Sequence, residues 1–201
     1  MISRAPWTAA LATMLALATA SCGTGGEPRS SSSESAELDP SALATPSRQD
    51  ANASDVHFLG MMTPHHEQAV TMSDDLLAAE GVSAETRDLA RRIRAGQAEE
   101  IDVMRQWAEA LGEQEAMRFH STHVANGMLP PEQLDRLGGL DGEQAEETFL
   151  RLMREHHEGA MAMTRDAVEN AGAESVADLG QHMLDVQTAE VKEMNALLGE
   201  D

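Results

Sequence analysis

Apolar residues recur at helical spacing along four stretches of this 201-residue chain. In each stretch, hydrophobic side chains return every three or four positions and a glycine follows the last of them. The pattern predicts helices from near Ser54 to Glu80, from Ser83 to Leu111, from about Glu143 to Ala171 and from Ser175 to Leu198. Residues 112–142 form a long connector between the second and third helices.

The predicted helices differ in how they begin and how regular they are. The residues expected to cap helix N-termini are Ser54, Ser83 and Ser175, the last with Asp178 in a capping box. Pro64 lies inside the first helix. A proline there removes one backbone hydrogen bond, so we expect a kink, unless Thr63 caps a new helix with Pro64 at its first position.

The two halves of the chain repeat one plan. Residues 58–72 (FLGMMTPHHEQAVTM) match residues 149–163 (FLRLMREHHEGAMAM) at a constant offset. The match continues downstream, where Gln97, Glu100, Ile101 and Met104 correspond to Gln187, Glu190, Val191 and Met194. Residues 53–111 therefore predict one helical hairpin and residues 143–199 a second. Together they predict an all-α fold, a four-helix bundle over residues 53–199 with one long crossover, as in ferritin-like proteins.

Composition supports packed helices and excludes some partners. The chain is 41% hydrophobic but only 2% aromatic, so aliphatic residues and methionine must fill the core. Its formal net charge is −21, which argues against binding to nucleic acid and against electrostatic docking on anionic lipid. The same charge is compatible with attracting cations.

The first 52 residues predict export. Residues 1–21 combine Arg4, an apolar run and small residues, as a secretory signal peptide does. The segment ending Ala20-Ser21-Cys22 resembles a bacterial lipobox, in which Cys22 becomes lipid-modified, and residues 23–52 are typical of a disordered tether. We therefore expect a protein held by lipid at the outer face of the cytoplasmic membrane; the alternative is ordinary secretion with a free Cys22.

Histidine and methionine share the inward face of the repeated motif. At 100° per residue, His65 points to the core with Met62 and Met72, and His66 lies on its flank. His156 faces inward with Met153 and Met163 in the second copy, flanked by His157. Imidazole suits copper, zinc, iron or nickel, while thioether sulfur favours copper, Cu(I) especially. These eight residues are candidate metal ligands, and His120 and His123 in the connector are further candidates.

Two interpretations of the histidine pairs stay open. They hold a metal ion, or they form a structural polar layer. In the first case four glutamates could be outer hydrogen-bond acceptors, and in the second they line a solvated face: Glu67, Glu158, Glu100 and Glu190. His182 stands alone on the last helix and favours a surface or structural role. No Glu-x-x-His element is present, which argues against a dinuclear iron oxidase. No catalytic triad, P-loop or dinucleotide-binding turn is present either, so we expect no enzyme.

The repeated elements resemble a known family. Met62-x-x-His65-His66 and Met153-x-x-His156-His157-x-Gly159-Ala160, with a Gly127-Met128 turn between them, are similar to the bacterial family catalogued as domain of unknown function 305. The resemblance covers about residues 54–199. It implies a ferritin-like four-helix bundle in exported proteins, some of which bind copper, and it makes the histidines and methionines named above the metal candidates.

These observations together predict a lipid-anchored, copper-binding protein outside the cytoplasm that buffers copper or hands it on. Either Cu(I) or Cu(II) is compatible with the histidine pairs. The competing hypothesis is a helical interaction module that binds no metal and whose histidine pairs are structural. A metal-dependent oxidoreductase is the least favoured alternative.

Overall fold

The computed structural model describes residues 43–114 and 126–200. The chain divides into two compact units, Met1–Ser33 and Glu34–Asp201; the first lies outside the described residues, so only the second is described below. Its described part holds five helices and no strand: α1 Ala53–Ala78, α2 Ala84–Leu111, α4 Pro131–Leu137, α5 Gly142–Asn170 and α6 Glu174–Leu198. The predicted all-α class is confirmed.

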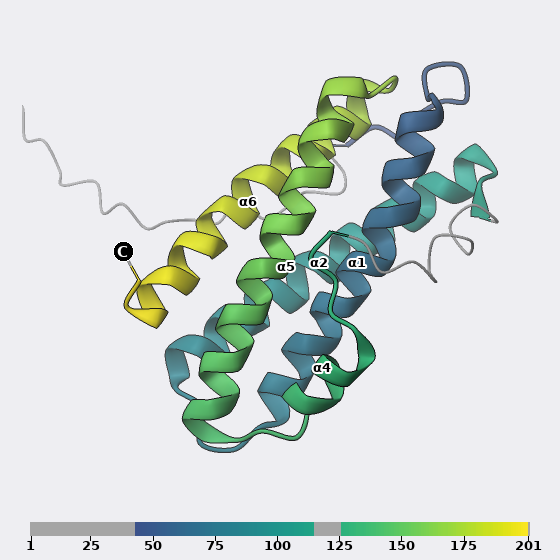
Figure 1. Cartoon of the computed structure of the whole chain (residues 1–201). Coiled ribbons are helices and arrows are strands. Elements are labelled where there is room, and N and C mark those ends of the chain that lie inside the picture. Colours follow the sequence, from purple (N-terminus) through teal and green to yellow (C-terminus); the bar gives the residue numbers. More distant parts are fainter. Residues whose placement is uncertain (1–42, 115–125, 201) are drawn as a thin grey trace, which may run out of the picture. The chain divides into compact units, whose positions relative to one another are not determined.

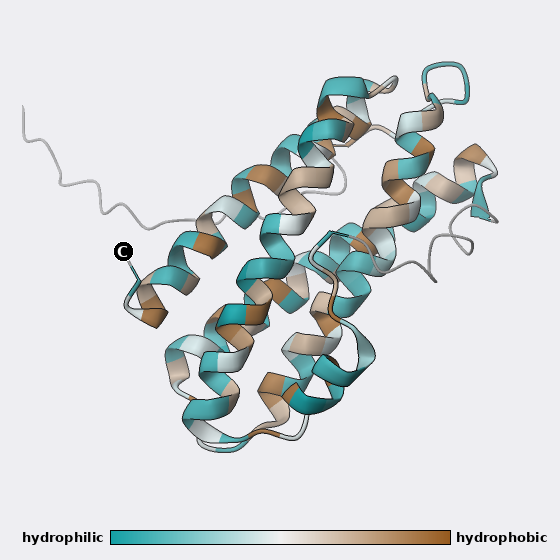
Figure 2. Cartoon of the chain, viewed as in Figure 1, coloured by the Kyte–Doolittle hydropathy of each residue, from teal (hydrophilic) through white to brown (hydrophobic). Residues whose placement is uncertain are grey.

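The four long helices pack as two hairpins (Figure 1). α1 packs mainly on α2 and α5 mainly on α6, and the contact of α1 with α5 joins the hairpins. Phe58 near the start of α1 shares a hydrophobic cluster with Ala167 near the end of α5, because these two central helices are antiparallel. Figure 2 shows hydrophilic and hydrophobic residues alternating along the helices. No helix in the described ranges is long and apolar enough to cross a membrane.

Several predicted helix ends are confirmed, but the predicted caps of α1 and α6 are wrong, and α1 ends at Ala78, two residues before the predicted Glu80. The Ser83 side chain caps α2 by accepting a hydrogen bond from the Thr86 amide. α2 and α6 end at glycines in the left-handed conformation, Gly112 and Gly199. Ser54, however, is not the cap of α1. The Asn52 side chain accepts from two amides of the first turn, because an asparagine two residues earlier satisfies the same orphan N–H groups.

The predicted start of the fourth helix is also wrong, for a tertiary reason. α6 begins at Glu174 after an Ala173 cap that makes no side-chain hydrogen bond. Asp55 on α1, only 1% exposed, accepts instead from the amides of Gly172 and Ala173. A cap supplied by another helix makes a local box of Ser175 and Asp178 unnecessary.

The second hairpin makes an equivalent contact with the turn of the first. Glu146 on α5 stands 91 positions after Asp55 and accepts hydrogen bonds from the Ser83 amide and hydroxyl and from the Thr86 hydroxyl. Partial burial raises the pKa of Glu146, but these three hydrogen bonds outweigh it and leave the pKa below its usual value. Each hairpin thus supplies the carboxylate that holds the turn of the other.

Pro64 does not divide the first helix. α1 continues through it, so a separate helix capped by Thr63 is wrong; the expected kink stays a prediction. The hydroxyl of Thr63 donates back to the Leu59 carbonyl at 2.8 Å. Pro64 itself is buried.

The connector contributes two features that the sequence pattern did not predict. One is α4, a two-turn helix with Pro131 at its first position. The other is the segment Asn126–Pro130, which we call the strap. Its backbone is fixed on α1 by Gln68, whose side-chain amide donates to the Leu129 carbonyl and accepts from the Leu129 amide.

On α5 the strap approaches so closely that only glycine fits. A Cβ on Gly159 would stand 1.9 Å from the Asn126 carbonyl oxygen. Asn126 has φ +24° and Gly127 φ +84°, a left-handed turn that brings the strap backbone against the helix. The two copies of the motif therefore differ at this position, with Gln68 in the first and Gly159 in the second, because each meets a different part of the strap.

Two hydrophobic clusters fill the bundle, one at each end. The first cluster contains Phe58, Leu59, Met62, Val103, Met104, Trp107, Ala160, Ala167, Leu179 and Met183, among others. The second contains Ala69, Met72, Leu76, Ile93, Leu129, Leu137, Phe149, Leu150, Met153 and Met194, among others. Every long helix contributes to both clusters, and between them each helix passes through a short stretch with polar residues.

The close approach at Gly159 leads to a stability prediction. Gly159→Ala should lower the free energy of unfolding by about 2 kcal/mol, because the strap must move away from α5. Gly96→Ala is the matched control. It adds the same methyl group to α2 with nothing within 4 Å, and should raise stability by about 0.5 to 1 kcal/mol. Urea unfolding of both variants checks this; equal stabilities would contradict the packing described.

Candidate metal centre

Four imidazoles lie together between the two hydrophobic clusters. His65 and His66 come from α1, His156 and His157 from α5, and all four side chains are 0% exposed. On α1 they fall between Met62 of the first cluster and Ala69 of the second. We call this group the imidazole layer. The structure thus brings both predicted histidine pairs into one buried site.

Two of the four rings are each held by a glutamate of the neighbouring helix. Nε2 of His66 lies 2.8 Å from Oε2 of Glu100 on α2, and Nε2 of His157 lies 2.8 Å from Oε2 of Glu190 on α6. A carboxylate accepts, so Nε2 of each ring carries the hydrogen of this bond, and the other nitrogen of the ring is Nδ1. Neither Nδ1 has a hydrogen-bond partner. Glu100 and Glu190 therefore bond to the rings, whereas Glu67 and Glu158 lie on exposed helix faces, where Glu67 pairs with Arg105.

The other two rings contact each other. The centroids of His65 and His156 lie 3.7 Å apart with a tilt of 42° between the ring planes. Nε2 of His65 donates to the Asn126 carbonyl of the strap at 3.0 Å, so its Nδ1 keeps a lone pair. That Nδ1 and both ring nitrogens of His156 lack a partner. Burying a polar group without a partner costs about 1 to 3 kcal/mol.

Burial keeps these rings uncharged. Loss of hydration lowers the pKa of His65 to about 3, although its bond to Asn126 acts in the opposite direction. Burial, and then the nearby His65, His157 and His66, lower the pKa of His156 well below its usual value. Neutral imidazole is the form that ligates metals. The site therefore offers buried lone pairs at neutral pH without a competing proton.

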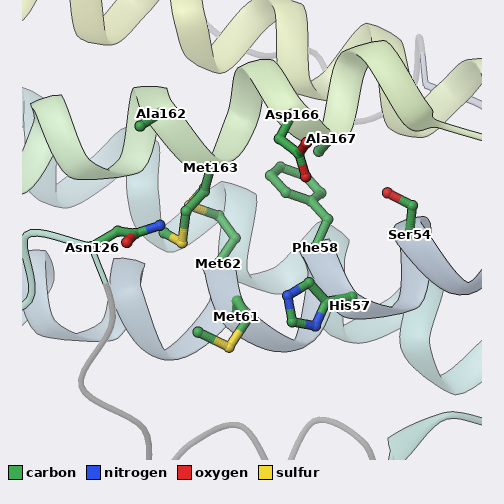
Figure 3. Close-up of a pocket in the computed structure, with 10 residues that line it drawn as sticks. All are labelled: Ser54, His57, Phe58, Met61, Met62, Asn126, Ala162, Met163, Asp166 and Ala167. Atoms are coloured by element: carbon green, nitrogen blue, oxygen red, sulfur yellow. The ribbon is translucent and has the colours of Figure 1, made fainter.

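The predicted methionine ligands lie on both sides of the layer. Met62 belongs to the first cluster, and Met72 and Met153 belong to the second. Met163 is half-buried beside the first cluster and lines a cavity together with Met62 (Figure 3). The structure thus does not gather the four sulfurs at one point.

Some predicted site residues cannot be placed. His120, His123 and Cys22 lie outside the described residues, as do the signal peptide and most of the tether. His182 is partly buried, with Nε2 4.0 Å from Oε1 of Glu100, so it neighbours the imidazole layer. Sequence reasoning missed Asn126 as a partner of His65. Only the residue types of the turn hinted at it, since Asn-Gly favours left-handed backbone.

Gln97 and Gln187 complete the polar layer on α2 and α6. They are 4% and 2% exposed, and they stand one turn before the two glutamates. Oε1 of Gln97 and both amide atoms of Gln187 have no partner. The repeat signal identified both residues, but without a direction for their side chains. Among the described residues, no three His, Cys, Asp or Glu side chains stand in a ready metal-holding arrangement.

Comparison with known proteins gives a consistent family. The family model described as "Domain of unknown function (DUF305)" matches residues 55–198. Among proteins of curated function, none matches this sequence.

Solved structures similar to this chain include two DUF305 proteins and CopM. A Streptomyces coelicolor protein described as secreted is 31% identical, with TM-score 0.65 over 73% of this chain and 93% of that one. A Deinococcus radiodurans fragment is 28% identical, with TM-score 0.65 over 75% and 99%. CopM in its Cu(II)-bound form is 28% identical, with TM-score 0.63 over 72% and 95%; CopM structures with Cu(I) and with silver also match.

The buried imidazoles predict that the metal-free protein loses stability in acid. Burial lowers the pKa of His65 to about 3 in the folded state, whereas its unfolded value is near 6.5. Between these two pH values the unfolded state binds a proton on His65 and the folded state does not, so acid favours unfolding. The contribution of the neutral, buried ring to stability is fully present above about pH 6.5 and is lost as the pH falls towards 3. His65 alone should remove about 2 kcal/mol between pH 7 and pH 5, and His156 acts in the same direction. Urea unfolding in the presence of a chelator at pH 7, 6 and 5 measures this; a flat profile would contradict neutral burial.

Proposed function

The chain belongs to the DUF305 family, and from that premise we propose that it binds copper and either buffers the ion or hands it on. The observation that carries the proposal is the imidazole layer. Four buried histidines meet in the core, and each has at least one ring nitrogen without a hydrogen-bond partner. A bound cation would satisfy lone pairs that the protein leaves without a partner. The copper-bound and silver-bound forms of CopM, a similar protein, support the choice of metal.

The hydrogen bonds of the layer support histidine as the ligand. In metal sites a ligating imidazole commonly donates its other N–H to a carboxylate or a backbone carbonyl, which fixes the tautomer and orients the ring. Glu100, Glu190 and the Asn126 carbonyl are in position to do this for His66, His157 and His65. In our proposal these three rings offer Nδ1 to the ion. His156 completes the set with either nitrogen.

Sulfur adds a preference for the reduced ion. Met62 and Met153 each precede a histidine pair by one helical turn, so they are the thioethers nearest in register to the layer. Neutral imidazole and thioether donors suit Cu(I) and also accept Cu(II). Thioethers bind Mg²⁺ and Ca²⁺ poorly, since these ions prefer oxygen ligands. The remaining candidate ligands, Met72, Met163, His120 and His123, stay predictions.

The cellular setting belongs to the proposal as well. Export through residues 1–21, a lipid on Cys22 and a tether up to residue 52 would hold the bundle outside the cytoplasmic membrane. Contact with the membrane would then run only through the lipid. We assign the protein no catalytic role and no nucleic-acid partner, because it has no Glu-x-x-His element and a net charge of −21.

A second function is a helical interaction module in which the layer is structural. Two observations favour it. Glu100 and Glu190 already satisfy one nitrogen of His66 and one of His157, and no three-residue metal group is preassembled among the described His, Cys, Asp and Glu side chains. This hypothesis predicts that copper leaves the melting temperature unchanged.

Copper titration of residues 23–201 separates the two functions. Cu(I) presented by a competing colorimetric chelator should bind the wild type tightly. At a free ion concentration of about 100 Kd, binding should stabilise the fold by about 2.7 kcal/mol and raise Tm by about 5 to 10 °C. His156→Gln should weaken binding by about 100-fold, comparable to the loss of a strong metal-site contact. That ring makes no hydrogen bond in the metal-free protein, so the variant should still fold.

Met183→Leu is the matched control. It changes a buried methionine of the first cluster to a residue of similar volume, so folding and copper affinity should stay close to wild type. Copper affinity that survives replacement of all four layer histidines by alanine would remove them as ligands. If adding Cu(I) or Cu(II) did not change the Tm of the wild type, copper binding would be excluded and the interaction module would be the remaining hypothesis.

A further inference from the structure

A cavity of about 270 Å³ lies between α1 and α5, beside the imidazole layer. Three methionines line it, Met61 and Met62 from α1 and Met163 from α5 (Figure 3). His57 and Asp166, both exposed, also line it. Three of the ten described lining residues thus offer thioether sulfur, in a cavity that communicates with solvent.

The solvent exposure of the three methionine side chains decreases from the mouth of the cavity to its inner end. Met61 and Met163 are half-buried, and Met62 is 0% exposed. Met62 lies one turn before His65 on the same face of α1, so the inner end of the cavity is next to the layer. Asn126 connects the two directly: it lines the cavity, and its carbonyl accepts the hydrogen bond from His65. A path of soft donors thus leads from the surface to the imidazoles.

The sequence repeat supplies an internal comparison. Counting 91 positions on, Met61 corresponds to Leu152 and Met62 to Met153, and Met163 corresponds to Met72 in the first copy. At that equivalent end of the α1–α5 contact, Leu129 of the strap and Leu137 of α4 pack into the second cluster. Met72 and Met153 are there 0% exposed. The described part of the connector thus covers the face that contains Met72 and Met153. The cavity lies at the equivalent face, which has Met61 as an additional methionine.

We propose that this cavity is the port through which a soft monovalent cation of the Cu(I) type enters and leaves the imidazole layer. Met61 and Met163 receive the ion at the surface, and Met62 passes it to the histidines. Thioethers carry no proton and hold such an ion weakly enough to exchange it. The carboxylate of Asp166 at the mouth, on a chain of net charge −21, favours the approach of a cation. The inference rests on the proposed copper function and adds the route.

The test separates the rate of copper transfer from affinity. Cu(I) complexed by a colorimetric chelator is mixed without oxygen with the purified chain, and the loss of the chelator's absorbance is followed by stopped flow. The initial decay gives the transfer rate, and the final absorbance gives the affinity. Met61→Leu should slow transfer about tenfold, within the range over which association rates vary among variants of one site. Affinity should stay within about twofold of wild type, because the imidazoles are intact.

Leucine keeps the volume of the half-buried Met61 side chain, so the variant should fold, and its circular dichroism and Tm verify this. Met183→Leu controls for the loss of a methionine away from the cavity. An unchanged transfer rate with intact affinity would overturn the port and leave the copper function standing. If the transfer rate and the affinity fell together, the cavity sulfur would be a ligand of the bound ion and not a step on its route, which would overturn the proposal. A wild type that takes up no copper would overturn the copper function itself.

Discussion

Burial of uncharged imidazole in the middle of a helical bundle is the constraint that organises this protein. An imidazole taken out of water needs an acceptor for its N–H, and hydrophobic side chains provide none. The chain meets this need from three directions, with Glu100 on α2, Glu190 on α6 and the Asn126 carbonyl of the strap. The glutamates have to stand at matching heights on their helices. The strap has to approach α5 closely, which it does at Gly159. Features far apart in the sequence thus serve one layer.

The two copies of the sequence motif supply equivalent parts of this layer, and the connector makes the two halves differ. Asp55 and Glu146 exchange caps between the hairpins, and the two His–Glu pairs are equivalent. Asn126 has no counterpart, so His65 gains an acceptor while His156 keeps two ring nitrogens without a partner. The same connector covers one end of the α1–α5 contact with Leu137 of α4. One chain segment therefore makes the two halves differ, both in the histidines and in their access to solvent.

The sequence predicted what depends on periodicity. Four helices, the ends at Gly112 and Gly199 and the inward direction of both histidine pairs follow from local signals that tertiary contacts reinforce. Two kinds of feature escaped. α4 spans two turns, too short for a periodic pattern. The cap of α6 is supplied by Asp55, more than a hundred residues earlier, and no local motif records such a contact. The contact of His65 with His156 is of the same kind, because helical angles give a direction but no distance across the bundle.

Stability alone does not account for a layer of this composition. Well-packed aliphatic side chains in place of buried polar groups are often as stable or more so. His156 carries an N–H that no acceptor meets, and Gln187 is buried with both amide atoms lacking a partner. Each such group costs about 1 to 3 kcal/mol, a large share of the usual 5 to 15 kcal/mol of a folded domain. Conflicts of this size with good packing tend to mark functional sites. The nitrogens without partners cluster where soft donors and a cavity meet, and this is the composition that the proposed copper function requires and that packing alone does not.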